Sequence, residues 1–158
     1  MFERVSAEEL SALEALALEV RNELAAAGLP VLAPGMSPVL AGGAQVEVDG
    51  GADAAGGVFV GWHASPRVRD CASRAFRLKQ LDAPILRHSS AVGAAMMQAM
   101  AAVLASAGFG VEDARDDYRP QELRVLTGPP SGQQPAWAIR DDELTLPGWQ
   151  DASSGRAD

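Results

Sequence analysis

The sequence predicts an α+β fold in which a mainly antiparallel sheet of about five to six strands is covered by three helices in a two-layer sandwich. Segments with apolar residues at helical spacing precede and separate short runs in which every second residue is apolar. The length of 158 residues fits one domain, and 47% hydrophobic with 22% charged residues is a globular composition. These observations favour a single compact core.

Residues 6–27 carry the signals of an amphipathic helix. Ser6 stands where an N-cap is needed, and Glu9 three residues later completes a capping box. Gly28 and Pro30 end the pattern. The apolar face is formed by Leu10, Leu13, Leu16, Val20 and Leu24.

Residues 29–63 change to short β-prone runs separated by proline and glycine, which predicts an antiparallel meander. In the later runs apolar and polar residues alternate, as in a sheet that is buried on one face. The glycines between the runs lead into strands rather than helices, so they do not form a phosphate-binding loop. The predicted strands are residues 29–32, 38–40, 45–49 and 57–63.

A second helix is predicted to begin with Ser65 as N-cap and Pro66 in its first turn, and to end at residues 82–84. Its apolar side includes Cys71, for which we expect a packing role. One cysteine cannot form an internal disulfide.

A third helix is predicted from Ser89 or Ser90 to Ala107, with Gly108 at its C-terminal end. It is apolar nearly all round, so we expect other elements to cover most of its sides. It approaches membrane-spanning length, but its alanine, glycine, serine and methionine residues are weakly apolar and favour a buried helix over a span.

Two further strands, at residues 109–114 and 122–127, complete a predicted single domain over residues 1–127. Residues 128–150 are interpreted as a linker followed by a small accessory hairpin. Residues 151–158 are predicted to be disordered.

The charge and composition restrict the classes of partner and the compartment. A net charge of −8 disfavours general binding to nucleic acids or anionic membranes, because both need a basic face. The N-terminus lacks a basic region followed by an apolar run, so we expect a cytoplasmic protein. Twelve arginines beside a single lysine, with abundant alanine and glycine, suggest a GC-rich bacterial genome.

Residues suited to catalysis are few. His63 ends a predicted strand, and Asp116 and Asp117 lie in a turn, so these three are weak catalytic candidates. The simpler interpretation of His63 is a residue at the end of a strand, on the rim of the sheet, without a catalytic role. His88 is interpreted as a loop residue. One cysteine and two histidines give no zinc signature, and the sequence predicts neither a metal site nor a cofactor.

Two features of the sequence indicate surfaces that could bind a partner: the distribution of charge and the composition of the third helix. Residues 65–88 contain six cations and two anions, a net charge of +4, which leaves −12 for the rest of the chain. Arg67, Arg74 and Arg77 share one helix face, which could bind an acidic protein, a phosphorylated ligand or the glutamates of the first helix. In the third helix, Met96, Met97 and Met100 accompany small residues; this surface suits either a dimer seam or a core helix.

The sequence therefore favours a non-enzymatic protein-binding or adaptor domain that acts as a homodimer. It would engage an acidic protein through Arg67, Arg74 and Arg77 and through Trp137. The alternative is a small enzyme or small-ligand-binding domain with a pocket near His63. A nucleic-acid-linked regulator is a third and weaker hypothesis, since the basic helix lacks interleaved aromatic residues.

Overall fold

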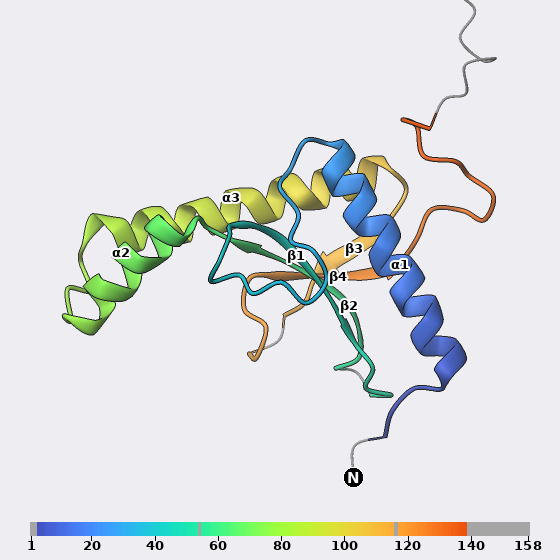
Figure 1. Cartoon of the computed structure of the whole chain (residues 1–158), viewed down its shortest axis with the longest axis horizontal. Helices are drawn as coiled ribbons and strands as arrows, with labels where there is room; N and C mark the ends of the chain where they lie inside the picture. Colours follow the sequence, from blue (N-terminus) through green and yellow to red (C-terminus); the bar gives the residue numbers. More distant parts are fainter. Residues whose placement is uncertain (1–2, 54, 116, 139–158) are drawn as a thin grey trace, which may run out of the picture.

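The computed structural model describes residues 3–53, 55–115 and 117–138, and it confirms the α+β class (Figure 1). The four strands form one antiparallel sheet in the order β1-β2-β4-β3, and a register shift separates Gly110 from Val111 in β3. The elements are α1 (Ala7–Ala26), β1 (Gly43–Asp49), β2 (Gly57–His63), α2 (Pro66–Arg77), α3 (Pro84–Ser106), β3 (Gly110–Asp113) and β4 (Glu122–Thr127).

The sheet has fewer strands than predicted, because residues 29–32 and 38–40 do not form strands. Val31 makes only an isolated parallel bridge to Ala44, while residues 38–40 lie in a turn. Ala44 donates its N–H to the Pro30 carbonyl at 2.8 Å and accepts from the Leu32 N–H at 2.9 Å. Prolines lack the N–H that a continuing ladder requires, so the contact stops after these bonds.

Gly43 permits this close approach. Its φ of +143° is a conformation that side chains with a Cβ rarely adopt, and a Cβ there would lie 2.6 Å from the Pro30 carbonyl oxygen. The Pro30 to Leu32 segment consequently lies directly along the outer edge of β1.

One face of the sheet forms the core with α1 and α3. Alternating residues of each strand point to this face, as the period of two requires. Leu24, Met100 and Leu104 are fully buried at its centre. The buried cluster is Ala17, Val20, Leu24, Ala44, Val46, Val58, Val60, Met100, Leu104, Phe109, Leu123 and Val125, and none of these belongs to α2.

The ends of α1 and α3 largely follow the sequence signals. The predicted capping box is present, since the Glu9 N–H donates to Ser6 Oγ at 3.2 Å and the Ser6 N–H donates to Glu9 Oε2 at 2.8 Å. Gly108 follows α3 with a φ of +93°, as expected at a helix C-terminus. The predicted start of α3 at Ser89 or Ser90 was wrong, because Pro84 occupies the first helical turn, where its missing N–H costs nothing.

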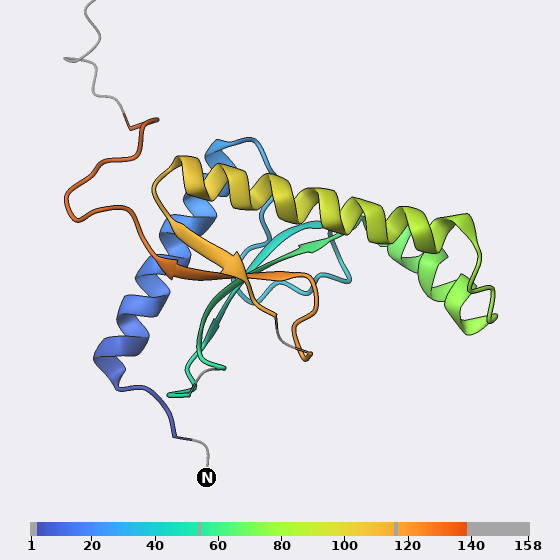
Figure 2. The same cartoon turned by 180° about the vertical axis from the view of Figure 1, so that it is seen from behind.

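The helical hairpin formed by α2 and the N-terminal half of α3 projects away from the sheet (Figures 1 and 2). We call residues 66–95 the arm. Within it α2 packs against α3, but Phe76 and Leu81 remain 66% and 67% exposed. The expectation that all three helices cover the sheet is therefore wrong for α2.

The prediction that α3 is covered on most sides is also wrong within one chain. Only Met100 and Leu104 of this helix are buried. By length and composition alone α3 could cross a membrane, and its most apolar stretch is only 11% buried. Periodicity identified an apolar helix, but it did not reveal that the helix is longer than the sheet beneath it.

Residues 128–138 leave the end of β4 and run beside α1 (Figure 2). We call this segment the strap. Both the predicted disordered tail and the predicted accessory hairpin beyond residue 138 lie outside the described residues.

Candidate functional sites

The three arginines predicted to bind a partner lie on the arm. Arg67, Arg74 and Arg77 are all exposed. The ion pairs within the described residues are those that Arg119 makes, so no glutamate of α1 neutralises these arginines there. The arm therefore presents its positive charge to solvent.

The three methionines predicted at a dimer seam differ in their surroundings. Met100 is fully buried in the chain's own core, whereas Met96 and Met97 are half-buried. The exposed residues beside them carry no charge, and they are Ser90, Ala91, Ala94, Ala95, Gln98, Ala99 and Ala102. The helix thus offers solvent a long surface of small, uncharged side chains.

Cys71 does not have the packing role expected of it. Its thiol is exposed on α2, and Ala75 is the buried residue of that helix. The apolar spacing in α2 did not predict burial, because α3 is the main element that this helix packs against, and Phe76 is left exposed as well.

The sheet face that points away from α1 and α3 carries a charge cluster that the sequence did not predict. Arg119 contacts Glu47, Asp49 and Glu122 at 3.1–3.2 Å. Its guanidinium also lies 4.1 Å from the centre of the Phe59 ring, a cation–π distance. Asp49 and Arg119 are 70 residues apart in the chain, so only the folded sheet brings them together.

His63 lies at the end of β2 and forms a short hydrogen bond with Gln45 Oε1. Burial lowers the pKa of His63 below its usual 6.5, and the positive charge of Arg69 lowers it further, against smaller opposing effects of Glu122 and Glu47. Asp117 is exposed and Asp116 lies outside the described residues. His63 does not line any of five well-formed cavities in the described part of the chain.

We predict that protonation of His63 lowers the stability of the folded chain at acidic pH. Because the folded chain binds the His63 proton more weakly than the unfolded chain, the free energy of unfolding should fall as the pH drops below about 6.5. The prediction is checked by urea unfolding at several pH values. In His63→Gln the slope in this pH range should be smaller, and in the control His88→Gln, which changes an exposed histidine, it should be unchanged. Equal slopes in all three proteins would contradict the assignment.

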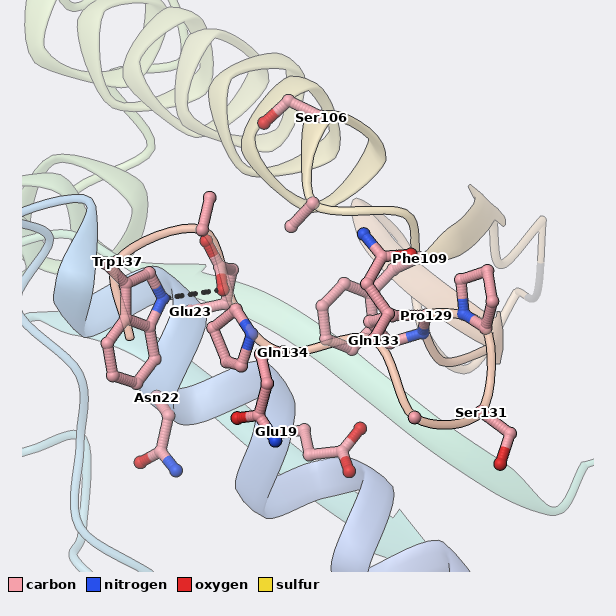
Figure 3. Close-up of a pocket in the computed structure, with 15 residues that line it drawn as sticks. Glu19, Asn22, Glu23, Ser106, Phe109, Pro129, Ser131, Gln133, Gln134 and Trp137 are labelled. Atoms are coloured by element: carbon pink, nitrogen blue, oxygen red, sulfur yellow. Dashed lines mark hydrogen bonds between the residues drawn. The ribbon is translucent and has the colours of Figure 1, made fainter. Parts of the chain in front are cut away.

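A cavity of about 410 Å³ lies between the C-terminal half of α1, the end of α3 and the strap (Figure 3). Trp137 closes one side of it, and its indole N–H donates to Glu23 Oε2 at 2.8 Å. The lining combines prolines of the strap, the Phe109 ring, uncharged polar side chains and the carboxylates of Glu19 and Glu23. From the sequence, Trp137 was interpreted only as part of an accessory hairpin, because its contact with Glu23 spans 114 residues of the chain.

Within the described residues, no group of three or more histidine, cysteine or acidic side chains is arranged to hold a metal ion. Comparison with known proteins gave no matching family model, no matching curated protein and no matching solved structure.

Proposed function

We propose that this chain is a non-enzymatic, homodimeric protein-binding module. The observation that carries the proposal is the arm, which projects from the core and exposes both apolar and basic side chains. An apolar surface of this kind on a soluble domain is typical of an interaction site.

The uncharged face of α3 is the surface that we assign to a second copy of the chain. Two copies that each carry a net charge of −8 repel one another over most of their surfaces. Contact through Ala91, Ala95 and Ala99 would desolvate no charge, and small side chains allow two helices to approach closely. A two-fold axis through this face would give the commonest form of oligomer.

The arginines of α2 are the surface that we assign to an acidic protein partner. Arg67, Arg74 and Arg77 are exposed and have no ion pair within the described residues. Charges on such a surface increase the rate of association and select the partner by sign.

The partner surface is tested with a fluorescein-labelled oligoglutamate peptide, measured by fluorescence anisotropy at low and high salt. We expect binding that weakens with salt, and a further loss of about threefold to tenfold in Arg74→Glu. Arg4→Glu makes the same change of charge at an exposed position outside the arm and should bind like the parent protein. Equal binding by the two variants, or none by the parent, would overturn this assignment.

Light scattering coupled to size-exclusion chromatography measures the oligomeric state directly. We expect a mass twice the 16.4 kDa of one chain. A single-chain mass at every protein concentration would overturn the proposed dimer. It would not affect the proposed binding of an acidic partner, which the peptide experiment tests separately.

A further inference from the structure

We propose that the cavity under the strap binds a guanidinium group, carried either by an arginine side chain of a polypeptide or by a free alkylguanidine. The cavity lies at the end of the core, and its lining includes none of Ala91, Ala95 and Ala99, so this inference is independent of the proposed dimer. Its volume of about 410 Å³ is within the range of small-molecule sites.

The charges around the cavity select a cation. Glu19 and Glu23 are the charged residues of its lining, and the described part of the chain supplies neither with an ion pair. An anion would be repelled by both carboxylates. A neutral apolar ligand would desolvate them without offering a hydrogen bond in return.

The hydrogen-bond donors of a guanidinium match the acceptors that remain. The Trp137 N–H already occupies Glu23 Oε2, which fixes this carboxylate and leaves its other oxygen to accept. Glu19, one helical turn earlier on α1, lies beside Gly128 of the strap, where a Cβ would lie 3.3 Å from its Oε2 atom. The absence of a side chain at Gly128 therefore leaves room beside this carboxylate.

The apolar walls suit a flat cation on an aliphatic stem. A guanidinium stacks on aromatic faces as well as pairing with carboxylates, which distinguishes it from a compact ammonium. Both aromatic residues line the cavity (Figure 3), Trp137 with 51% and Phe109 with only 6% of its surface exposed. Pro129, Pro130 and Pro135 complete walls that the methylene groups of the stem can contact.

The test is isothermal titration at low ionic strength with N-acetyl-arginine amide, compared with N-acetyl-citrulline amide, which has nearly the same shape without the charge. We expect the arginine compound to bind at least about tenfold more tightly. Glu19→Gln and Glu23→Gln should each weaken its binding about tenfold. The matched control is Glu8→Gln, which makes the same change at an exposed position of α1 outside the cavity, and it should leave binding unchanged.

Equal binding of the two compounds, no measurable binding of the arginine compound, or full binding by folded Glu19→Gln and Glu23→Gln would overturn the proposal. Circular dichroism establishes that each variant is folded. Titration with agmatine distinguishes the two sources of the group: tighter binding of agmatine supports a free alkylguanidine, and tighter binding of the blocked arginine supports a polypeptide side chain.

Discussion

Ala95→Glu should convert the proposed dimer into monomers. Ala95 is exposed in the middle of α3, on the uncharged face assigned to the second copy. By symmetry, each substitution places two carboxylates in one interface, where each loses water without gaining a partner. We expect the dissociation constant of the dimer to rise at least about 100-fold, measured by sedimentation equilibrium over a range of protein concentrations.

The matched control for this substitution is Ala15→Glu. Ala15 is also an exposed helical alanine, but it lies on α1, away from the arm, so the variant has the same added charge. It should remain dimeric. If Ala95→Glu and Ala15→Glu dissociate equally, net charge explains the effect and the α3 interface is wrong.

Leu104→Ala should cause the largest loss of stability among the substitutions considered. Leu104 is fully buried where α3 crosses the sheet, in the same cluster as Leu24 and Val60. Removing its buried methyl groups and leaving a cavity should lower the free energy of unfolding by about 2–5 kcal/mol. Urea unfolding at one fixed protein concentration measures this change, since dimerisation would make stability depend on concentration.

Leu40→Ala provides the comparison, because it makes the same chemical change at a side chain that is 77% exposed. Its effect should stay within about 0.5 kcal/mol. Losses of similar size at both positions would contradict the described core, in which α3 is anchored to the sheet by Met100 and Leu104.

Local signals in the sequence predicted several elements closely. The alternation of apolar and polar residues gave β2 and β4 the bounds that the structure has, Gly57–His63 and Glu122–Thr127. The capping box correctly identified Ser6 as the N-cap of α1, which begins at Ala7. In each case the residues that determine the element are its own or its immediate neighbours, so the pattern could be recognised without tertiary information.

The sequence predicted less where distant parts of the chain decide the outcome. Residues 29–32 resemble a strand, but Pro30 within them and Pro34 just beyond them limit the contact with β1 to an isolated bridge. The exposed arm could not be predicted, because an apolar helix has the same pattern whether its own chain or a second copy covers it. The cavity was also missed, since it depends on Trp137 meeting Glu23 across 114 residues.

The two outer strands of the sheet have a further consequence for how other molecules can approach. β1 is shielded along part of its edge by the segment that donates to and accepts from Ala44. β3 has only four residues, an irregular register at Gly110 and Val111, and the acidic pair Glu112 and Asp113. Short, interrupted and charged edges protect a sheet against adding strands from neighbouring molecules. Growth into fibrils by addition of strands at the sheet edges is therefore disfavoured. We expect this domain to contact other molecules through side chains rather than through backbone hydrogen bonds.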